Sequence, residues 1–249
     1  MYRSKWFIQI VLTMVLALAV PIVIAGNQQG EEQAGQQQAR ADIPRAVVDQ
    51  YDRAQNAGDV IGDLNRTPET GIPKYLMDRA YGIAVFPHVV KAAFIVGGSW
   101  GKGLLSVRRD GRWESPIYVE LTGGSFGFQI GGEATDLVLV FTDRKGVDSL
   151  LSAKLKLGAD ASVAAGPVGR EAEASTDIKL NASIYAYSRS RGLFAGIALD
   201  GAVMSLDNSS NRKVYGMEGK EVLDSAPRIS PVTTPFLAAL RQYSPAVTK

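Results

Sequence analysis

The sequence of 249 residues contains no cysteine and a single histidine, His88. Without cysteine the chain has no disulfide framework, no thiol nucleophile, no cysteine-bound zinc and no acylated lipobox. One histidine also excludes metal sites that are built from several histidines. A Ser-His-Asp triad would depend on His88, which directly follows Pro87, and no serine lies in a G-x-S-x-G elbow. We therefore expect no catalytic residue, no metal site and no cofactor.

The sequence has almost no net charge. Its 27 lysines and arginines exceed its 25 aspartates and glutamates by two, and two of the basic residues, Arg3 and Lys5, lie near the N-terminus. A chain that begins near Gly26 therefore has 25 residues of each sign, since 27 minus 2 is 25. This balance disfavours a globally basic nucleic-acid-binding protein, so any anion site must come from local clusters of charge.

The first 25 residues are typical of a secretory signal peptide, because a positive start is followed by the apolar run Phe7–Val20 and by small residues up to Ala25. An uncleaved anchor is the alternative, since Trp6–Ala25 is long enough to approach the thickness of a bilayer core. Both interpretations place the folded domain outside the cytoplasm, either free in the periplasm or cell envelope or anchored at the inner membrane. Residues 26–41, rich in glutamine and glycine, are predicted to form a flexible linker.

Helical spacing occurs at the start, in the middle and near the end of the remaining chain. Asp42 and Pro44 suit the first turn of a helix that continues to Gly58. Further helices are predicted over Lys74–Tyr81, Asp143–Ala153 and Thr234–Tyr243. We expect the domain to cover residues 42–225 and a tail with a short helix to cover residues 226–249.

Between these helices, short apolar or alternating runs typical of strands are separated by turns that contain glycine. The predicted strands are Ile83–Phe86, Ala93–Val96, Leu104–Arg109, Ile117–Leu121, Ser125–Ile130, Leu137–Phe141, Ile178–Tyr187 and Leu193–Leu206. Asp110-Gly111 favours a tight hairpin, because both central positions of such a turn adopt positive φ, and Asn208–Asn211 is predicted as a turn. The predicted fold class is α+β, with a largely antiparallel, strongly curved sheet that resembles a barrel or sandwich.

Glycine is unusually frequent within the predicted strands, where it normally weakens pairing. Strand glycines indicate either sharp sheet curvature or a ligand that lies against the backbone. The run Gly97–Gly103 does not match a phosphate-binding loop, because only three residues separate Gly97 from Gly101 and a glycine follows Lys102. A nucleotide is therefore not expected at this run.

Positive charge clusters in two parts of the otherwise neutral chain. Between residues 91 and 112 five basic residues stand against one aspartate, and between residues 179 and 191 three basic residues stand against none. Two tryptophans flank the first cluster, and indole rings favour the boundary between hydrocarbon and water. The candidate lipid-binding residues are Lys91, Lys102, Arg108, Arg109, Arg189, Arg191, Trp100 and Trp113. The alternative is that these charges protect solvated strand edges.

Six sequence blocks occur in the order of a known family. They are Gly82–Pro87, Gly97–Gly103, Trp113–Pro116, Gly123–Gly131, Leu157–Arg170 and Tyr185–Gly196. With these blocks the sequence resembles the SYLF-domain proteins, a lipid-binding family that is also found in eukaryotic endocytic actin-patch proteins.

The resemblance implies a non-enzymatic domain that binds membrane lipids, here anionic phospholipids in an exported protein of bacterial type. Actin binding in the eukaryotic proteins involves segments outside the shared blocks, so actin is not an expected partner. The leading hypothesis is an exported protein that contacts anionic phospholipid head groups. The alternative is an envelope protein-interaction or structural module that recruits a protein partner through exposed strand edges.

Overall fold

The computed structural model describes residues 34–66, 71–92, 98–126, 135–152, 154–168, 181–190, 193–197 and 199–245. The chain divides into two compact units, Met1–Pro44 and Arg45–Lys249. The predicted signal peptide or anchor lies outside the described residues. Residues 34–41 are helical although we expected a flexible linker, because their alanines, glutamines and arginine favour a helix despite Gly35. Among the residues described, no helix is long and apolar enough to span a bilayer.

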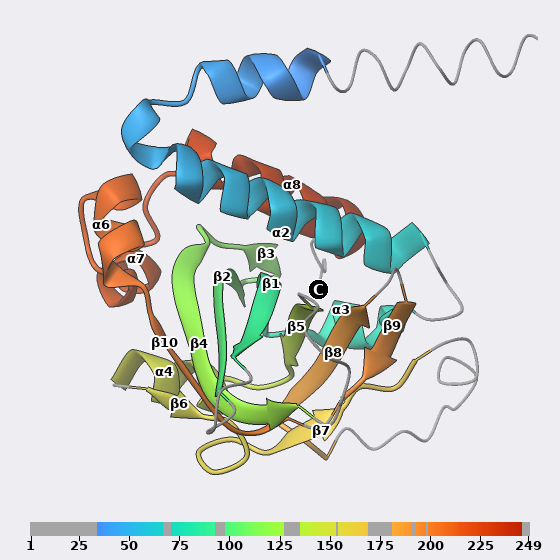
Figure 1. Cartoon of the computed structure of the whole chain (residues 1–249). Coiled ribbons are helices and arrows are strands. Elements are labelled where there is room, and N and C mark those ends of the chain that lie inside the picture. Colours follow the sequence, from blue (N-terminus) through green and yellow to red (C-terminus); the bar gives the residue numbers. More distant parts are fainter. Residues whose placement is uncertain are drawn as a thin grey trace, which may run out of the picture. The chain divides into compact units, whose positions relative to one another are not determined.

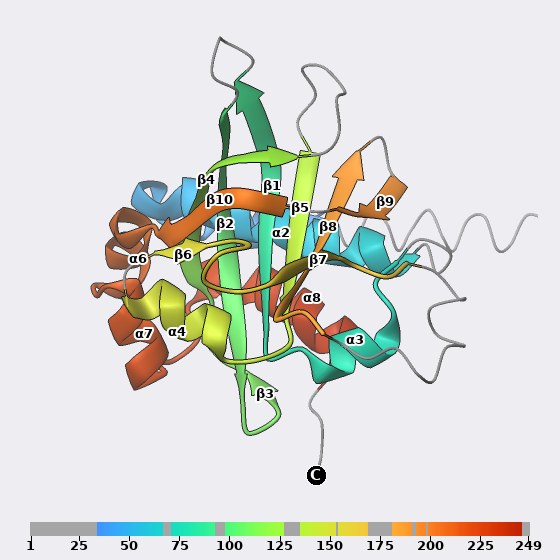
Figure 2. The ribbon, with the colours of Figure 1, turned by 90° about the horizontal axis from the view of Figure 1, so that it is seen from below.

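The second unit is built on one strongly curled sheet of ten strands (Figures 1 and 2). The strands are β1 (Gly82–Ala92), β2 (Gly98–Arg109), β3 (Arg112–Trp113), β4 (Ile117–Phe126), β5 (Thr135–Phe141), β6 (Leu155–Lys156), β7 (Val163–Ala165), β8 (Ile184–Ser190), β9 (Leu193–Gly196) and β10 (Leu199–Leu206). Their order is β6-β10-β4-β2-β1-β5-β8-β7, with β3 paired to β2 and β9 paired to β8. The pairs between these strands are antiparallel except β7 with β8. The predicted α+β class with a curved, largely antiparallel sheet is confirmed.

Helices cover both faces of the sheet. They are η1 (Arg45–Val47), α2 (Val48–Arg66), α3 (Lys74–Arg79), α4 (Lys145–Ser152), α6 (Asn208–Tyr215), α7 (Gly219–Ser225), η2 (Pro231–Thr233) and α8 (Thr234–Tyr243). The concave face, with Phe86 and Phe141, packs against α4 and α7. The opposite face, with Ile83, Val85 and Tyr118, packs against α2, α3 and α8. Figure 1 shows α2 and α8 lying across that face of the sheet.

Helix α2 continues well past Gly58, where we expected it to end. A Cβ atom at Gly58 would lie 3.0 Å from the backbone oxygen of Pro235, so the glycine allows α8 to approach α2 closely. Here glycine serves helix packing rather than helix termination. The predicted C-terminal helix has its predicted bounds, Thr234–Tyr243, and the middle helix begins at Lys145.

Two segments outside the predicted strands and helices form regular structure. Strand β1 runs through Pro87 and His88, with a bulge that shifts its register between Val85 and Val90 and gives His88 a φ of 57°. The predicted turn at Asn208 begins helix α6, because the side chain of Asp207 accepts a hydrogen bond from the backbone N–H of Ser210 and caps the helix.

The predicted hairpin at Asp110-Gly111 is confirmed. These residues join β2 to β3 with φ angles of 51° and 76°, and Arg109 pairs with Arg112 across the turn. Farther along β2, a Cβ at Gly103 would collide with the backbone oxygen of Val85. The glycine at 103 therefore makes room for the neighbouring strand rather than for a ligand.

Candidate functional site

The candidate lipid-binding residues of β2 and β3 lie at opposite ends of the sheet. Trp100 pairs with Val90, whereas Arg108 pairs with Trp113. The eight residue steps from Trp100 to Arg108 span about 26 Å at 3.3 Å per step. Figure 2 shows β3 at one end of the long strands and the tip of β1 at the other. We call these the Trp113 end and the Trp100 end, and their environments differ.

The Trp100 end presents apolar side chains to solvent. Val90 on β1 is 52% exposed and Trp100, its neighbour on β2, is 49% exposed. On its other side Trp100 pairs with the exposed Thr122 of β4, and Thr122 in turn pairs with Val203 of β10. Val90 was not among the predicted site residues. The bulge at His88 interrupts the alternation along β1, so simple alternation from the start of the strand does not show that Val90 lies on the same face as Trp100.

Lys102 lies two residues after Trp100, so both side chains leave the same face of β2. Its ammonium nitrogen is 5.6 Å from the centre of the Trp100 ring, a distance that suits a cation–π interaction. The same nitrogen is 3.4 Å from Glu120 Oε1 and 3.9 Å from Asp207 Oδ2. The charge of Lys102 is therefore shared with two carboxylates of the protein.

Asp207 anchors the polar side of this end. It is 4% exposed and accepts hydrogen bonds from the backbone N–H and hydroxyl of Ser210 and from Arg53 of α2. Burial alone would raise the pKa of Asp207, but the hydrogen bonds from Ser210 and Arg53 hold it below its ordinary value. Asp207 was not among the predicted site residues, although the pattern Asp-x-x-Ser after a strand is a helix-capping signal.

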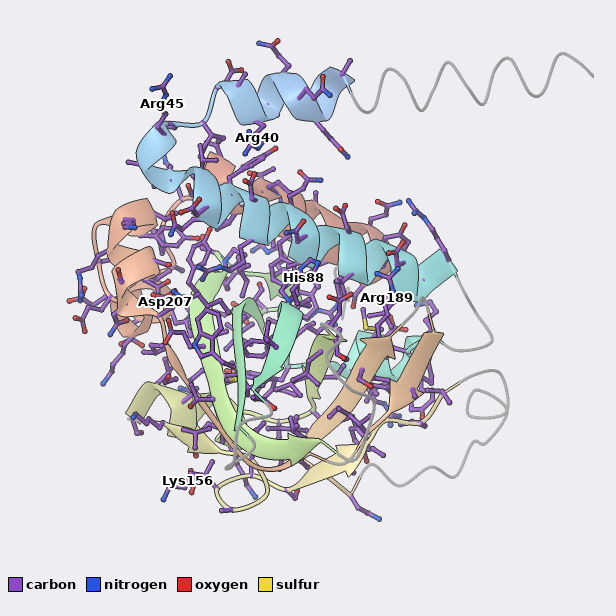
Figure 3. The ribbon with its side chains drawn as sticks, in the orientation of Figure 1. Arg40, Arg45, His88, Lys156, Arg189 and Asp207 are labelled. Carbon is purple, nitrogen blue, oxygen red and sulfur yellow. The ribbon has the colours of Figure 1, made fainter. Side chains whose placement is uncertain are left out.

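Arg189 lies near the same end but bridges parts of the protein (Figure 3). Its guanidinium is 2.7 Å from Asp63 Oδ2 of α2 and 3.4 Å from Asp136 Oδ2 of β5. Asp136 also accepts a hydrogen bond from the backbone N–H of His88. Arg189 thus ties α2 to the bulged part of the sheet, and a lipid phosphate would have to compete with two carboxylates for it.

At the Trp113 end the tryptophan and its cation are buried. Arg108 is 9% exposed and Trp113 is 4% exposed, with the guanidinium 4.5 Å from the ring centre. The guanidinium donates to the backbone oxygens of Asp78 and Ser244 at 2.7 and 2.8 Å, and the indole N–H donates to the same Ser244 oxygen. Desolvation lowers the pKa of Arg108. These contacts hold the end of α8 against α3 and leave no exposed head-group site at Arg108 or Trp113.

The remaining candidates are less defined. Arg109 is exposed, and its guanidinium donates to the backbone oxygen of Leu223 in α7 at 2.7 Å. Lys91 pairs with Ser99 through the backbone of β1, but its side chain lies outside the description. Arg191 also lies outside the described residues. The structure therefore brings Trp100 and Lys102 together, places Arg189 near the same end, and separates all three from Arg108, Arg109 and Trp113.

Comparison with known proteins gives the family of this fold. The profile of the Ysc84 family, described as Las17-binding protein actin regulator, matches residues 122–243. The chain is 35% identical over 175 residues to Protein YSC84 of Saccharomyces cerevisiae, covering 68% of this chain and 37% of the yeast protein. It is 38% identical over 153 residues to SH3 domain-containing YSC84-like protein 1 of Xenopus laevis, covering 61% of this chain and 45% of that protein.

The human protein of the latter name is 35% identical over 150 residues, which cover 59% of this chain and 44% of its own length. The matched region thus spans less than half of each of these three relatives. The family profile begins within β4, so Val90, Trp100 and Lys102 precede it. By these matches and by the curled sheet that carries them, the chain belongs to the Ysc84 family of SYLF-domain proteins.

Proposed function

We propose that this chain is an exported, non-enzymatic protein that binds the surface of anionic phospholipid bilayers through its Trp100 end. The observation that carries the proposal is the exposed pair Val90 and Trp100. The large hydrophobic side chains exposed in the described residues are Val90, Trp100, Val168 and Ile229. Val90 and Trp100 are direct cross-strand neighbours, and a cation lies beside the indole, as suits a bilayer interface.

The expected energies rank the contributions of these side chains. Removing on the order of 100 Å² of indole surface from water contributes about 2–3 kcal/mol, or between roughly 30- and 150-fold in partition. A lysine near an anionic leaflet contributes about 1 kcal/mol, or roughly fivefold. Because Glu120 already pairs with Lys102, the indole is the main contributor and Lys102 adds preference for anionic lipid.

The packed interior favours binding at the surface over a lipid cavity. Side chains on the concave face, such as Phe86, Phe141 and Leu139, have no exposed surface, and they belong to one continuous cluster with α4 and α7. Enclosing an acyl chain there would require these side chains to separate, and close-packed interiors resist such rearrangement. The proposed contact therefore uses the sheet end and leaves the interior intact.

Vesicle flotation tests this function. We use protein that begins at Gly26, because it keeps the whole Arg45–Lys249 unit and removes the apolar leader. Vesicles contain phosphatidylcholine alone or mixed with phosphatidylglycerol. We expect stronger binding to the mixed vesicles, a loss of about tenfold or more for Trp100→Ala, and a loss of up to about fivefold for Lys102→Ala.

Ile229→Ala is the matched control, because Ile229 is 40% exposed and lies in the segment between α7 and α8. It is expected to bind like the unchanged protein. Equal recovery with both kinds of vesicle, unaffected by Trp100→Ala, would overturn the proposal. Export is tested separately by the intact mass of the protein from cells, which is expected to show cleavage after Ala25; retention of the leader in a cytosolic fraction would contradict export.

A protein partner is the second candidate, since the family description names Las17 binding for relatives. The first and last strands of the sheet, β6 and β7, offer little backbone for β-augmentation, because β6 has two residues and β7 has three. A partner would find more apolar surface at the Trp100 end. Recovery of one defined envelope protein by the unchanged chain but not by Trp100→Ala, together with no vesicle binding, would favour this candidate.

A further inference from the structure

A polar pocket lies at the opposite end of the sheet from Trp100. It has a volume of about 440 Å³ and is lined by Arg79, Thr142, Asp143, Lys145, Ser162, Asn181, Ala182 and Ser183. These residues come from the end of α3, the start of α4, the loop before β7 and the segment before β8, elements that are labelled in Figure 2. Its volume is within the range of about 300–1,000 Å³ that is usual for small-molecule sites.

Two cations at the pocket have no carboxylate partner in the part of the chain that is described. Arg79 and Lys145 are both exposed, and the ion pairs of the described residues include neither. This distinguishes them from Lys102 and Arg189, whose charges are shared with acidic residues. An anion that enters the pocket can therefore meet two positive groups without displacing a carboxylate of the described residues.

Asp143, the acidic residue among the described residues of the lining, is already hydrogen-bonded within the protein. Asp143 Oδ1 accepts from the backbone N–H of Lys145 at 2.9 Å, and Oδ2 accepts from the hydroxyl of Ser183 at 2.7 Å. The hydroxyl oxygen of Ser162 accepts from the backbone N–H of Ser183, so its proton remains available to a ligand. Asp143 thus holds two pocket segments in place, while Ser162 and Asn181 offer hydrogen bonds to polar atoms.

We propose that this pocket binds a small phosphate-bearing polyol, such as a glycerol phosphate, either free or as the head group of a lipid. The phosphate is recognised by Arg79 and Lys145, because charge-assisted hydrogen bonds to phosphate are the strong contacts available here. The hydroxyl groups of the polyol meet Ser162 and Asn181. The polar lining excludes an acyl chain. The pocket is independent of the proposed bilayer contact, because none of its residues belongs to the Trp100 end.

Calorimetric titration with glycerol 1-phosphate, and with glycerol alone, tests the pocket in protein that begins at Gly26. We expect saturable binding of the phosphate, no binding of glycerol, and a loss of about tenfold or more in Arg79→Ala and in Lys145→Ala. Lys220→Ala, a change of an exposed lysine on α7, is the control and should bind normally. Thermal unfolding of all variants should be alike, because the three side chains are exposed.

Flotation with vesicles that contain phosphatidic acid identifies the source of the phosphate, when all variants also carry Trp100→Ala so that the Trp100 end does not hold the vesicle. Loss of vesicle binding in Arg79→Ala and Lys145→Ala assigns the pocket to a lipid head group, whereas loss of glycerol phosphate binding alone assigns it to a soluble ligand. The proposal is overturned if both variants retain both activities or if neither the phosphate nor the vesicles bind. Trp100→Ala should leave glycerol phosphate binding unchanged, which separates this result from the test of the bilayer contact.

Discussion

Each end of β2 brings a tryptophan next to a cation, but the two pairs lie in opposite environments. Trp100 is half exposed beside Lys102, and Trp113 is buried beside Arg108. The cation lies within 6 Å of the ring centre in both pairs, at 5.6 and 4.5 Å. The comparison shows that residue type and cation–π geometry do not determine whether such a pair serves binding or folding. The segments that pack around the pair determine which of the two roles it has.

The surroundings differ because other segments end near only one of the pairs. The backbone oxygens of Asp78 and Ser244, at the ends of α3 and α8, point at Arg108. Such oxygens at helix ends lack partners within the helix and need donors. At the other end, the partners of Lys102 are side-chain carboxylates that remain partly accessible or hold α6 and α2. Arg108 therefore donates hydrogen bonds to the ends of two helices, whereas Lys102 lies beside an exposed indole.

The largest predicted effect is at the buried pair. Arg108→Met removes the donor of the Asp78 oxygen and one of the two donors of the Ser244 oxygen, so it should lower the free energy of unfolding by about 2–4 kcal/mol. Lys102→Met, at the exposed pair, should change it by less than about 1 kcal/mol. Urea unfolding of the two variants measures this difference directly. Similar small losses in both variants would contradict a structural role for Arg108.

A second prediction concerns the middle of β2, which must keep both ends in register. In Gly103→Ala the new methyl group meets the backbone of Val85, so we expect a loss of about 1–3 kcal/mol in the free energy of unfolding. Gly62→Ala on α2 is the matched control, because the nearest atom would be 4.0 Å away, on Tyr243. That change should stabilise the protein by up to about 1 kcal/mol. Equal stability of both variants by urea unfolding would argue against the close approach of β1.

A third prediction uses pH at the polar side of the Trp100 end. Asp207→Asn keeps a capping side chain but removes the charge that pairs with Arg53, so it should cost about 1–2 kcal/mol at pH 7. Because the folded-state pKa of Asp207 is lowered, its charge stabilises the fold above about pH 4 and loses that effect as the pH falls through the folded pKa. The difference from the unchanged protein should therefore shrink in acid.

Urea unfolding at pH 7 and pH 3 measures this convergence. Asp148→Asn is the control, because the pair of Asp148 with Arg144 is exposed and should contribute no more than about 0.5 kcal/mol at either pH. A constant difference between Asp207→Asn and the unchanged protein at both pH values would show that the charge of Asp207 is not what stabilises the fold.

Local chemistry was enough to predict much of the fold. The turn at Asp110-Gly111 and helix Thr234–Tyr243 depend on neighbours in sequence, and both are present as predicted. The burial of Arg108 could not be predicted, because its partner Ser244 is 136 residues away. The carboxylate that shares the charge of Lys102, Glu120, is adjacent only through the pairing of β2 with β4. The clusters of positive charge are therefore visible along the sequence, whereas the groups that pair with these charges in the fold are not.

The smallest effect on stability and the largest on binding are expected at the exposed pair. Trp100→Phe should change the free energy of unfolding by no more than about 0.5 kcal/mol, as for other surface substitutions. The change leaves Trp113 as the tryptophan within the Arg45–Lys249 unit, where it is buried against Ser244. Comparing the fluorescence of this variant with that of the unchanged protein therefore assigns a lipid contact to one indole.

The most direct test is quenching of tryptophan emission by vesicles with brominated acyl chains, in protein that begins at Gly26 and so lacks Trp6. If the Trp100 end enters the bilayer interface, the unchanged protein loses part of its emission on vesicles that contain phosphatidylglycerol, and Trp100→Phe loses none. Quenching that persists undiminished in Trp100→Phe, or vesicle binding without any quenching, would contradict the assignment of lipid contact to this end of the sheet.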